Sequence, residues 1–132
     1  MIYFVGGHRD LSHSDFELYY EPIIDNIIAN DKESEFVVGD CDGVDKFTMN
    51  YIFKYYQVPL TIYHMFDAPR NIPEGLSKNP ESEGVFFKGG FKSDEERDSA
   101  MTKASDFDIA FIKDNRWDSG TAQNIKRRHG IV

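Results

Sequence analysis

The chain has one cysteine and no long apolar run. The single cysteine, Cys41, excludes an internal disulfide framework and fits a reducing cytoplasm. No apolar stretch approaches the roughly 20 residues that a membrane-spanning helix needs. The first residues, MIYFVGGHRD, show neither the basic start nor the cleavage region of a signal peptide. We therefore expect a cytoplasmic protein with no part in a membrane.

Basic residues are scarce in the first third of the chain, which argues against a protein that binds duplex DNA. The net charge is −8, and residues 1–45 hold 11 acids against two bases. Binding to the DNA backbone needs a basic surface that neutralises phosphates. The basic cluster Lys126–Arg128 is short, and it suits the negative end of a helix dipole instead.

What the chain does contain is an alternation of apolar, β-prone runs with segments of helical periodicity. Strands are expected at residues 2–5, 36–38, 60–63 and 108–112, the last buried on both faces of the sheet. Strand–helix–strand order is typical of right-handed parallel units. We predict one domain over residues 1–132, a three-layer Rossmann-like α/β fold whose mainly parallel sheet has four to five strands.

Local patterns predict where the helices begin and end. Capping boxes begin at Ser14 and Ser93. Pro22 either kinks the first helix or starts a new one in its first turn, and we favour a single helix that ends near Asn30. The last helix is expected to start from Asp118 or Ser119 and to stop at His129–Gly130, which leaves Ile131 and Val132 as the beginning of a fifth strand.

The second predicted helix carries an aromatic stripe. Asp42 is its expected N-cap, and Val44, Phe47, Tyr51 and Tyr55 recur along one face. We interpret this stripe as core packing.

Residues 65–92 break the alternation, because they hold three prolines and four glycines. A connection of this length is usually functional or mobile. We interpret it as a lid-like excursion over the strand ends, with a short extended piece at residues 85–87. A disordered decoration is the alternative.

Three turn-forming segments are expected to meet at one edge of the sheet. If the first predicted strand lies between the second and the fourth, the switch point of the sheet falls between the first and the fourth. Residues 6–10, 39–45 and 113–121 then converge there. The capped helix start at Gly120 offers free N–H groups and the positive end of a helix dipole, which favour an anion.

The chain resembles the SLOG superfamily, Rossmann-like domains related to the Lonely Guy and DprA proteins, and in particular its small bacterial and phage members. The motifs that carry the resemblance cover nearly the whole chain except residues 65–92. They are Gly6-Gly7, Gly39–Asp45 (GDCDGVD), Arg97–Met101 (RDSAM), Ser105–Ala110 (SDFDIA) and Ser119–Thr121 (SGT). The resemblance implies that a nucleotide or nucleotide-derived ligand binds across the strand ends.

Asn124 departs from the pattern of two enzymes in this group. Lonely Guy proteins hydrolyse the N-glycosidic or phosphoribosyl bond of a modified adenine nucleotide, and nucleoside deoxyribosyltransferases cleave a similar bond through a carboxylate. Both carry a glutamate three positions beyond the threonine of this turn, where Asn124 stands here. An amide is neither a carboxylate nucleophile nor a general base.

Three functions therefore stay open. The first is a sensor, carrier or sequestering protein for a nucleotide derivative. The second is an N-glycosidic hydrolase or nucleoside deoxyribosyltransferase that uses Asp40, Asp45 or Asp98 as its catalytic acid. The third is a protein-interaction module on the same scaffold.

The expected ligand contacts lie in the loops just described. Phosphate or ribose oxygens are expected at Gly120 and Thr121, with Arg97 adding charge unless it pairs with nearby acids on the surface. The full set is Gly6, Gly7, Arg9, Gly39, Asp40, Asp42, Gly43, Asp45, Arg97, Ser119, Gly120, Thr121 and Asn124. Aspartates of the second loop suit ribose hydroxyls, a base edge or a Mg²⁺ that accompanies the nucleotide. Trp117 could stack on a base or equally shield the edge of the sheet.

Other sites and partners are expected as follows. The four histidines share no zinc-ligand spacing, and Cys41 is interpreted as a small loop filler. Relatives commonly oligomerise, so a homo-oligomer is expected.

Overall fold

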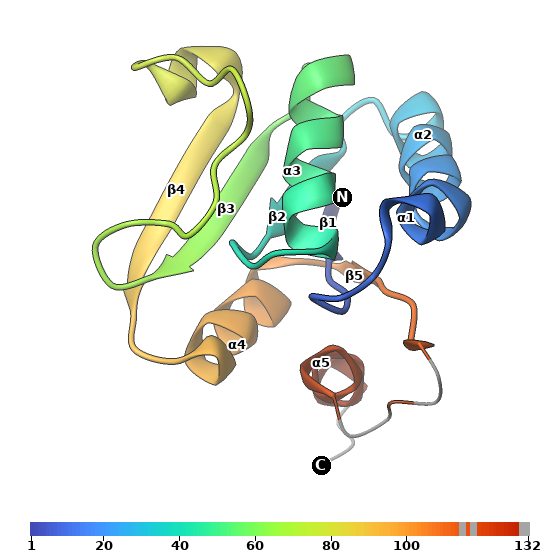
Figure 1. Cartoon of the computed structure of the whole chain (residues 1–132). Helices are drawn as coiled ribbons and strands as arrows, with labels where there is room; N and C mark the ends of the chain where they lie inside the picture. The colour runs from blue at the N-terminus through green and yellow to red at the C-terminus, as the bar shows by residue number, and fades with distance from the viewer. Residues whose placement is uncertain (114–115, 117–118, 130–132) are drawn as a thin grey trace.

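Five parallel strands form one sheet in the order β4-β3-β2-β1-β5 in the computed structural model, which describes residues 1–113, 116 and 119–129 (Figure 1). The strands are β1 (Ile2–Val5), β2 (Glu35–Val38), β3 (Leu60–Met65), β4 (Val85–Phe91) and β5 (Phe107–Ile109). Every neighbouring pair is parallel. The predicted Rossmann-like α/β fold with a parallel sheet is confirmed.

Helices cover both faces of this sheet. They are α1 (His13–Tyr19), α2 (Glu21–Asn30), α3 (Val44–Tyr55), α4 (Asp94–Ala104) and α5 (Gly120–Arg128), with a short 3₁₀ helix, η1 (Pro80–Glu83). The larger core cluster joins α1–α3 to strand residues such as Val5 and Val38. On the other face, Met101 of α4 packs with Phe4, Val37 and Tyr63. Alternate strand residues thus enter two cores, which makes three layers. In the described part of the chain, no helix has the length and apolar character to cross a membrane.

The last strand is shorter and more exposed than predicted. The sequence predicts a strand at residues 108–112, buried on both faces, whereas β5 spans Phe107–Ile109 at the edge of the sheet. Phe107 is 47% exposed. Phe111 has left the sheet and stacks on Tyr19, with ring centroids 4.2 Å apart. An edge strand has a neighbouring strand on one side only and is therefore less covered than a central strand. For this reason the apolar run at residues 108–112 did not predict how exposed β5 is.

Part of the predicted excursion belongs to the sheet. Residues 85–91 form β4, which pairs with β3 from Leu60–Val85 to Met65–Phe91. The connection outside the sheet is therefore residues 66–84. The glycine at position 89 made this strand hard to recognise in the sequence. Packing against β3 nevertheless favours glycine there, because a methyl group at Gly89 would lie 2.1 Å from the His64 ring.

Three helix boundaries differ from those predicted. The favoured single helix is wrong, because α1 ends at Tyr19 and Pro22 lies in the first turn of α2, where its missing N–H costs nothing. The cap of α1 is Ser12, two residues before the predicted box. Asp42 does not cap α3 either. Gly43 takes that place with φ +72°.

The other helix starts agree with the prediction. Ser93 caps α4 by accepting from Glu96 N, and Ser119 caps α5 by accepting from Ala122 N. The basic end of α5 has structural partners: Arg128 Nη1 donates to Ser105 O at 2.9 Å. The predicted roles of Asp118, Trp117, Gly130 and the stub at 131–132 lie outside the described residues.

The aromatic stripe of α3 is only partly core. The buried residues of this helix are Val44, Asp45, Thr48, Met49 and Ile52. Tyr55 is 61% exposed. Phe47 and Tyr51 are partly buried and pack against the core beside Val44, so the interpretation as core packing is confirmed for these three residues and wrong for Tyr55.

Candidate functional site

A cleft of about 380 Å³ lies at the carboxyl ends of β1 and β2, next to the point between β1 and β5 where the strand order reverses. It is closed on one side by α4 and on the other by the start of α5. The predicted site residues that line it are Gly6, Gly7, Arg9, Asp45, Arg97, Asp98, Gly120, Thr121 and Asn124. Gly39, Asp40, Asp42, Gly43 and Ser119 lie outside this lining. The structure thus brings the three predicted loops together with α4.

Hydrogen bonds tie the loops after β1 and β5 to each other. Gly6 N donates to Ile109 O at 3.0 Å. Tyr20 Oη donates to Gly6 O at 2.9 Å and accepts from Phe111 N at 2.9 Å. Lys113 N donates to His8 Nε2 at 2.9 Å. Sequence reasoning missed Tyr20, which lies between α1 and α2, because a buried tyrosine has the same local pattern as any core residue.

Three of the predicted ligand-contacting glycines are required by the packing of the protein itself. A methyl group at Gly7 would lie 2.4 Å from Val44 Cγ2, and one at Gly39 would lie 2.6 Å from Asp45 Oδ2. At Gly43, which has φ +72°, it would lie 2.4 Å from Arg9 O. By contrast, a methyl group at Gly120 would meet no atom of the described residues within 4 Å. The start of α5 is therefore open to the cleft.

Arg97 is the buried centre of an ion-pair network, not a surface residue. Its side chain is 5% exposed, and Nη1 lies 2.8 Å from Asp40 Oδ1 and 3.2 Å from Asp94 Oδ1. Nε and Nη2 donate to Asp98 Oδ1 at 3.1 and 2.9 Å. Three carboxylates thus share this guanidinium, which fixes Asp94 and Asp98 on the cleft wall and Asp40 behind it.

Arg70 completes the network from the connection between β3 and β4. Its backbone N donates to Asp40 Oδ2 at 2.7 Å, and Nη2 donates to Asp40 Oδ1 at 2.9 Å and to Asp94 Oδ1 at 3.0 Å. Burial would raise the pKa of Asp40, but hydrogen bonds from Arg70, and then the charge of Arg97, hold it below its usual value. Asp40 is thereby committed to protein donors, and nothing local in the sequence marked Arg70 as its partner.

Asp45 has a different environment, although it lies beside the same arginine. It is 7% exposed, lines the cleft, and accepts a hydrogen bond from Cys41 N at Oδ2, 3.1 Å away. Burial raises the pKa of this carboxyl to about 7, against the opposing effect of Arg97. A carboxyl group that titrates near neutrality in a cleft can hold or accept a proton during a reaction. Burial also raises the pKa of the Cys41 thiol, which fits its predicted role as a filler.

Asn124 faces Asp98 across the cleft wall. Its Nδ2 donates to Asp98 Oδ2 at 3.2 Å, and its Oδ1 accepts from Arg127 Nη1 at 2.7 Å. A glutamate at position 124 would set a second negative charge against Asp98. The amide instead supplies a donor, so Asp98 accepts hydrogen bonds on both of its oxygens.

The remaining predicted contacts are peripheral. Arg9 Nη2 lies 2.9 Å from Asp94 Oδ2 in an exposed pair. Asp42 Oδ1 accepts from Asn71 Nδ2 at 3.1 Å. Within residues 1–113, 116 and 119–129, no group of three or more His, Cys, Asp or Glu side chains is arranged to hold a metal ion.

Comparisons of the chain with protein-family models, with characterised proteins and with solved structures gave no significant match. The functional interpretation therefore depends on the geometry of the cleft and on its charges. One wall of the cleft is the open start of α5, and the other carries a network of carboxylates and arginines.

Proposed function

We propose that this chain binds a nucleotide or nucleotide-derived small molecule in the cleft, as a sensor, carrier or sequestering protein. The observation that carries the proposal is the open start of α5 at Gly120, which faces a polar cleft at the switch point of a parallel sheet. The cleft volume of about 380 Å³ falls in the range of small-molecule sites. The resemblance of its loops to the SLOG superfamily supports the same ligand class.

The two walls of the cleft suit different parts of such a ligand. The anionic part belongs at Gly120 and Thr121, because first-turn N–H groups have no acceptor within the helix and the dipole favours negative charge. Asp45 and Asp98 would repel a phosphate but accept hydrogen bonds from ribose hydroxyls or a base edge. Arg97 acts chiefly by holding Asp98, since its donors already meet carboxylates.

Calorimetric titration with AMP and adenosine tests this assignment. Gly120→Val places a branched side chain in the open space, so AMP affinity should fall at least about tenfold. Gln123→Val is the matched control, because it adds the same side chain to an exposed position of α5 and should change affinity less than about twofold. If Gly120→Val binds AMP as tightly as the parent, the anion lies elsewhere.

A second candidate is hydrolysis of an N-glycosidic bond, and the shared cleft position of Asp45 and Asp98 favours it. A protonated Asp45 could give its proton to the departing base while the bond from C1′ to nitrogen breaks. Asp98 could take a proton from the water whose oxygen bonds to C1′. Free base, detected by chromatography after incubation with nucleosides, should then disappear in Asp45→Asn and persist in Asp42→Asn. The absence of base with the parent protein would leave binding as the function.

A further inference from the structure

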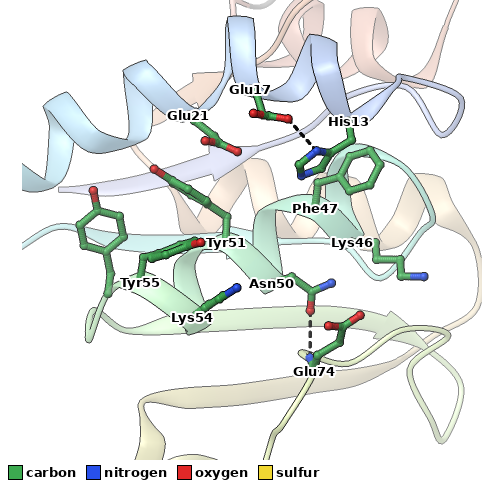
Figure 2. A pocket seen from close by; sticks show the side chains of 11 residues that line it. His13, Glu17, Glu21, Lys46, Phe47, Asn50, Tyr51, Lys54, Tyr55 and Glu74 are labelled. Atoms are coloured by element: carbon green, nitrogen blue, oxygen red, sulfur yellow. Dashed lines mark hydrogen bonds and ion pairs between the residues drawn. The ribbon is translucent and has the colours of Figure 1, made fainter.

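A second and larger cavity, about 890 Å³, lies along the outer side of α3. Its walls are α1 and the start of α2 on one side and α3 on the other, with Glu74 of the connection at its edge (Figure 2). It shares no lining residue with the cleft at the strand ends. We call it the α3 groove.

One wall of the α3 groove carries carboxylates at helical spacing. Glu17 and Glu21 line it, and Asp25 follows one turn later. Glu17 pairs with His13, whereas Glu21 has no hydrogen bond or ion pair to any described residue, although it is half-buried. Burial raises the pKa of Glu21, and the negative charge of Glu17 adds to the effect. Glu21 is thus a carboxylate without a cation.

The opposite wall carries aromatic rings at the same spacing. Phe47, Tyr51 and Tyr55 lie one turn apart on α3, and Tyr51 extends toward Glu21 (Figure 2). The hydroxyls of Tyr51 and Tyr56 both donate to Asp25 Oδ1, and these hydrogen bonds fix the positions of the Tyr51 and Tyr56 rings. Tyr55 remains 61% exposed, so part of its ring surface is open to a ligand.

An organic cation binds well where aromatic ring faces, which attract it by cation–π interaction, lie next to an unpaired carboxylate. The protein itself shows this preference, because Lys54 Nζ lies over the Tyr55 ring, 5.2 Å from its centroid. The other lysine of the groove, Lys46, points away from these tyrosines (Figure 2). The strongly acidic first third of the chain, with 11 acids against two bases in residues 1–45, adds a long-range attraction for cations.

We propose that the α3 groove binds a linear aliphatic cation with two or more ammonium groups. Glu21 on one wall and Glu74 at the far edge offer separate partners for separate charges, and Glu17, one turn before Glu21, keeps His13 as its partner. The tyrosine rings cover the methylene chain and the ammonium nearest Tyr55. This site is independent of the nucleotide proposal, since neither its residues nor its ligand are shared.

Titration with spermidine at low ionic strength tests the proposal. Glu21→Gln and Tyr55→Ala should each weaken binding about fivefold or more, whereas Tyr55→Phe keeps the ring and should stay within about twofold. Lys54→Gln should tighten binding about threefold, because it removes the internal competitor for the Tyr55 ring. Glu33→Gln is the matched control. It removes the same charge from an exposed position outside the groove and should change affinity less than about twofold.

Three outcomes would overturn the proposal. One is no binding of spermidine by the parent protein. Another is an equal loss in Glu21→Gln and Glu33→Gln, which would indicate non-specific attraction to an acidic surface. The third is displacement of spermidine by equimolar Mg²⁺ or tighter binding of a lysine-rich peptide, which would assign the groove to a different partner. Tyr55 is exposed, so its variants test binding without disturbing the core.

Discussion

At the residue scale, Asp40 and Asp45 show how two neighbouring carboxyl groups acquire different properties. Both are buried, yet Asp40 accepts from two arginines while Asp45 Oδ2 accepts from a backbone N–H. The pKa of Asp40 is lowered and that of Asp45 is raised to about 7. Burial alone would raise the pKa of both groups. The number of hydrogen-bond donors and positive charges around each carboxyl therefore decides which of the two can exchange a proton near neutral pH.

The raised pKa of Asp45 predicts a pH dependence of stability. The folded state holds the Asp45 proton up to about pH 7, whereas the unfolded chain releases it near pH 4. Folding stability should therefore fall as pH rises, by about 2–3 kcal/mol between pH 5 and 8. Asp45→Asn should remove this part of the dependence in denaturant titrations at the two pH values. Asp42→Asn, an exposed change in the same loop, should retain it, and equal behaviour of the two variants would contradict the assignment.

At the element scale, the connection between β3 and β4 braces the cleft. Arg70 joins it to the end of β2 and to the first residue of α4, and Asn71 Nδ2 donates to Asp40 O at 2.9 Å. A segment that sequence composition marked as a loop thus orders the carboxylates behind the site. The start of α5 faces the same cleft, and Ser119 caps it locally.

Removing the brace should destabilise the protein. Arg70→Met deprives the nearly inaccessible Asp40 of its main donor, so the free energy of unfolding should fall by about 1–3 kcal/mol in urea titrations. Arg9→Met breaks a pair with Asp94 in which both side chains are well exposed, and it should cost less than about 1 kcal/mol. If the two variants cost the same, Arg70 does not support Asp40 in solution.

At the scale of the whole molecule, the sheet has two edges, β4 and β5. Phe86 on one is 40% exposed and Phe107 on the other is 47% exposed. Apolar edge strands can pair with another chain unless they are covered. A homo-oligomer stays a prediction on these grounds.

Light scattering should give a mass that is a multiple of 15.2 kDa. If β5 is the contact, Phe107→Lys should reduce the mass to that of one chain, while Phe86→Lys on the other edge should leave it unchanged. A parent protein of 15.2 kDa at high concentration would contradict the prediction.

The sequence by itself determined the parallel α/β architecture and the meeting of the turns that follow β1, β2 and β5. These features follow from local patterns: short apolar runs, helical periodicity, and the caps Ser93 and Ser119. Only the tertiary structure decided that the extended piece predicted at 85–87 continues to 91 as a strand of the sheet, that Gly7, Gly39 and Gly43 serve packing, and that Arg97 joins three carboxylates. The physical reason is that each of these depends on contacts between residues far apart in the chain. Asp40 and Arg97, for example, are 57 positions apart and meet at 2.8 Å only once β2 and α4 have packed together.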